Sequence, residues 1–273
     1  MNNIFDKFSL KNKVAVVTGG SGLLGKQFCT TLAEAGAQVV VADLDGDSAQ
    51  KTADSINSLG YKANAAQVDI TQPESVKNMV EETVSDYKKL DILVCSAAMD
   101  PKFDPEHVGS HGNSFEDYPL ESWKSALDVN LTGMFLSTQA AVKPMVSQNY
   151  GVIILICSTY GLVGPDQRLY EKPGKPVQYK PVFYTVTKAG VLGLTKYLAT
   201  YYAGKNIRIN ALTPGGIYND HDEDFTQKYS SRTVLGRMAN KDEMNGALLY
   251  LASDASSYMT GSNLVVDGGW TAW

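Results

Sequence analysis

The segment Lys13-Val-Ala-Val-Val-Thr-Gly-Gly-Ser-Gly-Leu-Leu-Gly25 decides the fold of this chain. Residues 13–18 form a short apolar run rich in β-branched side chains, which is typical of a strand buried on both faces of a parallel sheet. Glycines 20, 22 and 25 follow in a G-x-G-x-x-G pattern and open a helical stretch that ends near Gly36. Strand, glycine-rich turn and helix in this order predict a turn that approaches a pyrophosphate at the helix N-terminus.

The next predicted strand, residues 38–42, ends at an acidic side chain, Asp43. A carboxylate about 20 residues beyond the glycines accepts hydrogen bonds from the hydroxyl pair of a ribose and repels a 2′-phosphate. The sequence therefore favours NAD over NADP as a cofactor. The alternative is a turn that holds no ligand and an Asp43 that only caps the following helix.

The rest of the chain alternates apolar strands with amphipathic helices, which predicts a doubly wound parallel α/β sheet with helices on both faces. Its 273 residues fit one domain, residues 1–273. Further strands are expected at 62–68, 91–95, 152–157, 207–212 and 264–266, and further helices at 46–58, 74–87, 121–147, 182–203 and 240–252.

Two connections, residues 98–119 and 160–181, are too long for simple turns. Both leave the carboxyl ends of strands, where open α/β sheets bind ligands, so we expect them to form walls of a substrate site. Disordered surface insertions are the alternative. His107 and His111 in the first connection are four residues apart, but Gly109 between them argues against a helix, and no metal site is expected.

Composition excludes several classes of partner. The net charge is −5, with no basic block, which argues against nucleic acid or an anionic membrane. No run of 18 apolar residues and no signal-peptide pattern are found, so we expect no membrane span and a cytoplasmic location. The three cysteines, Cys29, Cys95 and Cys157, lack the spacing of metal ligands and are expected to be free buried thiols.

Tyr184 and Lys188 are four residues apart, so on a helix both project from one face, with Ser158 upstream. An ammonium beside a phenol lowers the pKa of the tyrosine toward neutrality. Such a tyrosine can give or take a proton at a carbinol or carbonyl oxygen. Two solvated residues on a helix are the alternative.

Several further motifs occur in order along the chain, and with them it resembles the short-chain dehydrogenase/reductases over nearly its whole length. The resemblance implies a Rossmann-like, seven-stranded sheet, a nicotinamide cofactor and an active site of Asn130, Ser158, Tyr184 and Lys188. Asn130 would hold a water that relays protons to Lys188; a core asparagine satisfied by backbone alone is the alternative. The motifs are Thr18–Gly25, Asp69-Ile70, Cys95–Ala98, Asp128–Asn130, Ile156–Ser158, Tyr184–Lys188, Asn210–Ile217, Thr260-Gly261 and Val266–Gly269.

The cofactor contacts expected from the glycine pattern and the resemblance come from the glycine turn, the ends of the next strands, the catalytic pair and the segment after the sixth strand. Three residues depart from the family pattern and leave cofactor anchoring open: Leu23, Ser96 and Asn219 replace the usual Gly, Asn and Thr. The expected contact residues are Gly19, Ser21, Gly22, Leu24, Gly25, Asp43, Asp69, Ile70, Ser96, Ala97, Tyr184, Lys188, Pro214, Gly215 and Ile217.

The connection 160–181 joins Ser158 to Tyr184 and has net positive charge. Arg168 and Lys172 suit an anionic group, and Tyr170 and Tyr179 suit a sugar ring. We therefore expect a secondary alcohol or ketone on a polar, sugar-type, anionic substrate. The amino-acid sequence of this connection also resembles that of oxidoreductases of bacterial flagellin and surface-glycan modification. The alternatives are a 3-oxoacyl-thioester reductase and a catalytically silent dinucleotide-binding protein.

The resemblance also implies a homo-oligomer, a two-fold symmetric homotetramer first and a dimer second. Apolar side chains on the two long helices, among them Phe135, Val191 and Leu194, are expected to form the contact face. Trp270 and Trp273 near the C-terminus are expected to be covered as well, because exposed tryptophans are unusual.

Overall fold

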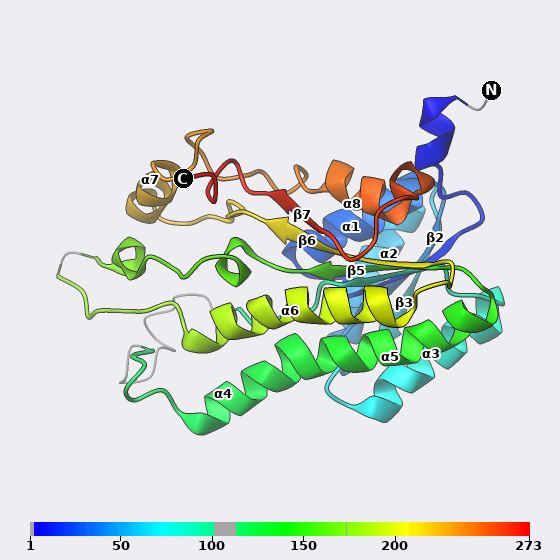
Figure 1. The fold of residues 1–273 in the computed structure, drawn as a ribbon, viewed down its shortest axis with the longest axis horizontal. Helices are drawn as coiled ribbons and strands as arrows, with labels where there is room; N and C mark the ends of the chain where they lie inside the picture. The colour runs from blue at the N-terminus through cyan, green and yellow to red at the C-terminus, as the bar shows by residue number, and fades with distance from the viewer. Residues whose placement is uncertain (1–2, 101–112, 173) are drawn as a thin grey trace.

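A seven-stranded parallel sheet forms the centre of the computed structural model, which describes residues 3–100, 113–172 and 174–273 (Figure 1). The strand order is β3-β2-β1-β4-β5-β6-β7, which confirms the predicted fold class and strand number. The strands are β1 (Val14–Thr18), β2 (Gln38–Asp43), β3 (Ala63–Gln67), β4 (Ile92–Cys95), β5 (Gly151–Ile156), β6 (Ile207–Pro214) and β7 (Asn263–Val266).

Helices cover both faces of the sheet (Figure 1). Successive strand residues point to opposite faces, so Ala15 and Val17 enter one core and Val16 enters the other. The first core is closed by α1 (Leu23–Glu34), α2 (Gly46–Ser58) and α8 (Asn245–Ala252). The second is closed by α3 (Pro73–Tyr87), α5 (Gly133–Ser147) and α6 (Val182–Tyr201).

The order of the strands reverses at β1, which pairs with β2 on one side and β4 on the other. Connections from β1 and β4 therefore diverge and open a crevice at the carboxyl edge of the sheet. At two positions the glycine turn leaves no room there for a side chain. A Cβ on Gly19 would lie 2.6 Å from the Cα of Ala97, and one on Gly25 would lie 1.9 Å from the carbonyl oxygen of Gly19.

The helix predicted over residues 121–147 contains an interruption. α4 (Leu120–Leu127) runs into a π-helical turn, Asp128–Thr132, before α5 continues in the same direction. The wider turn puts the amide of Asn130 against the backbone of Met99, where it makes two hydrogen bonds. Single π turns of this kind are frequent at functional sites.

Two parts of the C-terminal third differ from the prediction. α7 (Glu223–Ser230) was not predicted, and α8 begins at Asn245 rather than at residue 240. The stretch before α8 is a turn because the Glu243 carboxylate accepts hydrogen bonds from the Asn240 backbone and from the Arg237 guanidinium.

The structure describes one of the two long connections almost completely and the other only in part. Residues 160–181 are an ordered segment that includes a short 3-10 helix, Gln167–Tyr170, apart from position 173, which is not described. Most of residues 98–119, including His107 and His111, lie outside the described residues.

The predicted surface residues are only partly at the surface. Val191 is fully buried in the second core, so its predicted place on the contact face was wrong. Trp270 is covered as expected, by the ring of Tyr229 in the same chain. Phe135 and Trp273 are exposed. The three cysteines are free and buried, as predicted. None of the described helices combines the length and apolar character needed to cross a bilayer.

The close packing of the glycine turn gives a stability prediction. Gly25→Ala should destabilise the protein by about 1–3 kcal/mol, because the new Cβ overlaps the Gly19 carbonyl and forces the backbone to shift. Gly246→Ala is the matched control: this exposed glycine of α8 has open space around it, so alanine should be neutral or stabilising by up to about 1 kcal/mol. Urea unfolding measures both, and an unchanged midpoint for Gly25→Ala would contradict the packing argument.

Candidate active site

One cleft of about 940 Å³ follows the carboxyl edge of the sheet from the glycine turn to α7. All the predicted cofactor and catalytic residues line it except Asn130. The residues that the structure brings together are Gly19, Ser21, Gly22, Leu24, Gly25, Asp43, Asp69, Ile70, Ser96, Ala97, Ser158, Tyr184, Lys188, Pro214, Gly215 and Ile217.

At the glycine end of the cleft, Asp43 is tied to the turn itself. Its carboxylate accepts hydrogen bonds from the backbone N–H of Ser21, at 3.0 Å, and of Asp45, at 3.3 Å. The cap of α2 is Asp45, whose side chain accepts from the N–H of Ser48. Asp43 is therefore not the helix cap of the alternative interpretation, and it stays available at the cleft wall.

The next two strand ends complete this wall. Asp69 accepts hydrogen bonds from the backbone N–H and the hydroxyl of Thr71, at 2.9 and 2.7 Å, which fixes the loop after β3. The N–H of Ser96 donates to the carbonyl of Thr18, so the pairing of β4 with β1 extends to the departing residue. Ser96 and Asn219, two of the residues that differ from the family pattern, both line the cleft.

Ser158, Tyr184 and Lys188 meet at the middle of the cleft. Ser158 lies two residues beyond the end of β5, and its hydroxyl accepts from the N–H of Tyr160. Tyr184 lies in the first turn of α6 and lines the same part of the cleft as Ser158. Lys188, one turn later, is buried; its Nζ donates to the carbonyl of Ile156 at 2.9 Å and lies 5.8 Å from the centre of the Tyr184 ring.

Burial controls the protonation of this pair. Burial raises the pKa of Tyr184 above its usual value, the charge of Asp100 raises it further, and the nearby Ser158 hydroxyl lowers it. Burial likewise lowers the pKa of Lys188. The prediction that the pKa of Tyr184 falls toward neutrality was wrong, because loss of hydration is the largest influence on the phenol and raises its pKa. A raised pKa favours the neutral phenol, which can donate a proton.

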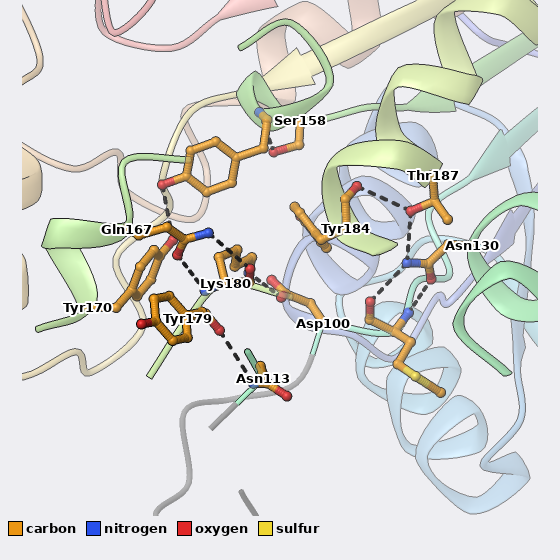
Figure 2. Close-up of polar contacts among 12 residues, drawn as sticks. Asp100, Asn113, Asn130, Ser158, Gln167, Tyr170, Tyr179, Lys180, Tyr184 and Thr187 are labelled. Carbon is orange, nitrogen blue, oxygen red and sulfur yellow. Dashed lines mark hydrogen bonds and ion pairs between the residues drawn. The ribbon is translucent and has the colours of Figure 1, made fainter. Parts of the chain in front are cut away.

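Asn130 lies behind the cleft rather than in its wall. Its Oδ1 accepts from the N–H of Met99 at 2.6 Å, and its Nδ2 donates to the carbonyl of Met99 at 3.0 Å and to the hydroxyl of Thr187 at 3.4 Å (Figure 2). These contacts tie the segment after β4 to α6. They match the interpretation of a core asparagine satisfied largely by backbone, and the water relay stays a prediction.

Aromatic side chains form the far end of the cleft. Tyr160 and Tyr170 share a hydrogen bond of 3.0 Å between their hydroxyls, and burial raises the pKa of Tyr160 to about 12. Phe225 lies 5.6 Å from Tyr170 and 5.9 Å from Tyr229, between ring centres. Both of these α7 residues were missed; the signal was Asp222, whose side chain caps α7 by accepting from the N–H of Phe225.

The positive charge expected from the second connection is already neutralised. The guanidinium of Arg168 donates to both carboxylate oxygens of Asp166, at 2.9 and 2.8 Å, and Arg168 does not line the cleft. Lys172 lines the cleft but pairs with Asp222 at 2.9 Å. The expected anion site on Arg168 and Lys172 is therefore wrong. Tyr170 lines the cleft, and Tyr179 does not.

Comparison with known proteins finds relatives of this chain over nearly its whole length. The model of the family described as "Enoyl-(Acyl carrier protein) reductase" matches residues 21–271. The chain is 32% identical to a 3-oxoacyl-[acyl-carrier-protein] reductase of Aquifex aeolicus, over 96% of this chain and 99% of that protein. It is 34% identical to a cyclohexanol dehydrogenase of Acinetobacter, over 96% of each protein.

Solved structures are similar to this chain over a comparable length. A short-chain type dehydrogenase/reductase from Mycobacterium marinum has a TM-score of 0.86 and 37% identity, with both chains fully covered. A gluconate 5-dehydrogenase from Burkholderia cenocepacia, solved in complex with NADP and tartrate, has a TM-score of 0.85 and 28% identity, over 99% of this chain and 100% of that one.

Proposed function

The chain belongs to the short-chain dehydrogenase/reductase family and is an oxidoreductase of CH–OH groups; from this premise we propose that it forms a single NAD-dependent catalytic domain acting on a polar, sugar-type secondary alcohol or ketone. One observation carries the proposal. Tyr184, beside buried Lys188, opens together with Ser158 into the same cleft as the glycine turn.

The residues of the chain divide the proton chemistry among them. The Ser158 hydroxyl binds the oxygen of the substrate, and the Tyr184 phenol donates its proton to a carbonyl oxygen or takes one from a carbinol. Lys188 lies beside the phenol and supplies a positive charge when that phenol ionises. When bound, a nicotinamide dinucleotide supplies the hydride exchange with the carbinol carbon.

The residues present fit such a dinucleotide. The glycine turn presents bare backbone at the N-terminus of α1, which suits a pyrophosphate. Asp43 and Asp69 line the cleft nearby, and the described residues that line this end carry no cation for a 2′-phosphate. This supports NAD, although the related gluconate 5-dehydrogenase structure carries NADP.

The far end of the cleft supports a compact polar substrate. It combines aromatic rings from Tyr160, Tyr170 and Phe225 with paired charges, the mixture that suits a hydroxylated ring. A 3-oxoacyl-thioester reductase is the second candidate, favoured by the relative of that name from Aquifex aeolicus. Retention of Ser158, Tyr184 and Lys188 in one cleft argues against a catalytically silent protein. A cytoplasmic location and a role in surface-glycan modification stay predictions from the sequence.

We also propose a homotetramer, with a dimer second. Phe135 on α5 and Val186, Tyr197 and Tyr201 on α6 are large side chains that stay exposed on two of the helices covering one face of the sheet. Light scattering at micromolar concentration should give the tetramer. Phe135→Asp with Tyr201→Asp should shift it to smaller species, whereas Phe115→Asp, exposed elsewhere, should not. A monomeric wild-type protein would overturn this proposal.

Cofactor preference can be tested at Asp43. Calorimetric titration should give NAD at least about tenfold tighter binding than NADP, because a 2′-phosphate would meet the carboxylate. Asp43→Asn keeps an acceptor for the Ser21 N–H but removes the charge, so it should narrow this preference. Asp47→Asn, an exposed residue of α2, serves as the control. Equal or tighter binding of NADP to the wild type would refute the proposal.

The role of Tyr184 can be tested by removing one oxygen atom. Tyr184→Phe should keep the fold and NAD affinity but lower kcat on the best alcohol of a secondary-alcohol panel by at least about 100-fold, the effect of losing an acid/base group. Tyr258→Phe, which changes a fully exposed tyrosine, should leave kcat unchanged. A Tyr184→Phe variant with normal kcat would exclude Tyr184 as the acid/base.

A further inference from the structure

A second lysine lies against the tyrosine of the active site. Lys180 precedes α6, and its side chain is only 9% exposed. Its Nζ forms an ion pair with Asp100 and sits 4.1 Å from the centre of the Tyr184 ring, closer than Lys188 (Figure 2). Asp100 comes from the segment after β4, so the pair joins two connections far apart in sequence.

The position of Lys180 is fixed by its backbone. The Lys180 N–H donates to Gln167 Oε1 at 2.8 Å, and Gln167 Nε2 donates to the Lys180 carbonyl at 3.2 Å (Figure 2). This two-way contact pins the start of α6 to the short 3-10 helix of the second connection. The ammonium is thus held in place before any substrate arrives, which lowers the entropy cost of binding.

Both members of the pair have hydrogen-bonding capacity left for a ligand. Both line the cleft, and the Asp100 side chain is 48% exposed. An ammonium has three donors, and within the described part of the chain the Asp100 carboxylate is the single hydrogen-bond acceptor of Lys180 Nζ. The carboxylate in turn accepts several hydrogen bonds. A donor, the Lys180 ammonium, and an acceptor, the Asp100 carboxylate, therefore lie together beside the ring of Tyr184.

The charges around the pair favour a neutral group over an anion. The charge of Lys180 is balanced by Asp100, and Asp220 and Asp222 line the same end of the cleft, where Lys172 pairs with Asp222. A second carboxylate or phosphate would be repelled by these groups. A hydroxyl matches the pair, since it donates its hydrogen to a carboxylate and accepts from an ammonium.

We propose that Asp100 and Lys180 recognise a hydroxyl on the carbon next to the reacting carbinol carbon, and so select vicinal diols and their hydroxyketones. The inference rests on the proposed function in one respect, that Tyr184 binds the reacting oxygen. Lys180 donates to the neighbouring hydroxyl oxygen and Asp100 accepts its hydrogen. Neither residue takes part in the proton transfer; both set substrate specificity.

Binding of matched ligands tests the proposal independently of turnover. Ligand-observed NMR compares the binding of cyclohexanol, 1,2-cyclohexanediol and 2-hydroxycyclohexanecarboxylate, in the absence of any cofactor and in the presence of NADH. The oxidised cofactor is left out of both samples, so the alcohols are not oxidised. The wild type should bind the diol at least about tenfold more tightly than cyclohexanol, because hydrogen bonds to charged groups are the stronger class. Asp100→Asn and Lys180→Met should each reduce this preference to about threefold or less.

Matched controls separate recognition from general disturbance. Asp117→Asn and Lys175→Met change exposed residues of the same two connections outside the cleft and should keep the full preference. Should Lys180→Met fail to fold, Asp100→Asn decides the question, since its side chain is half-exposed and the change is isosteric.

Three results would overturn the proposal: equal binding of diol and cyclohexanol, a preference that survives in Asp100→Asn, or tighter binding of the carboxylate than of the diol. The last would make Lys180 an anion site. A diol preference without oxidation of any alcohol would support recognition and refute the proposed catalysis. Tyr184-dependent oxidation of cyclohexanol without a diol preference would do the reverse.

Discussion

The contact between the glycine turn and the segment after β4 is the constraint on which the cleft depends. Gly19 approaches the backbone of Ala97 so closely that no side chain fits between them. This contact sets where the first loop of the cleft lies relative to the fourth strand. Asn130 then holds Met99, two residues further along, from behind through its buried amide. The wall that carries Ser96, Ala97 and Asp100 is thereby fixed from both sides.

The parts of the molecule that sequence could predict are those set by local patterns. Each of these patterns can be recognised within a short stretch of sequence: the β-branched runs of β1 and β2, the glycine turn, and the spacing of Tyr184 and Lys188. Positions at strand ends follow from the parallel topology, which brings Asp43, Asp69 and Ser158 to one edge. These predictions required no knowledge of contacts between distant residues.

The predictions that failed depended on contacts across the fold. Arg168 is neutralised by a residue two positions away, but whether it faces the cleft is decided by the packing of the whole segment. The partners of Lys180 lie at positions 100 and 184, one of them 80 residues distant. The pKa of Tyr184 rises because of burial, a quantity that spacing along a helix does not contain. α7 is short and polar, and its apolar contacts with Tyr170 exist only after folding.

The second connection is bound to α7 and to the residues that flank it. Lys172 pairs with Asp222, Lys228 donates to the carbonyl of Glu171, and Arg232 pairs with Asp166. Two segments separated by the whole of α6 and β6 are thus joined by three polar contacts. If the 160–181 segment alone were grafted onto a related scaffold, its three residues would lose the polar partners that residues 219–233 supply. A graft that carries the segment together with residues 219–233 would keep them, so the two pieces form the natural unit of exchange between enzymes built on this sheet.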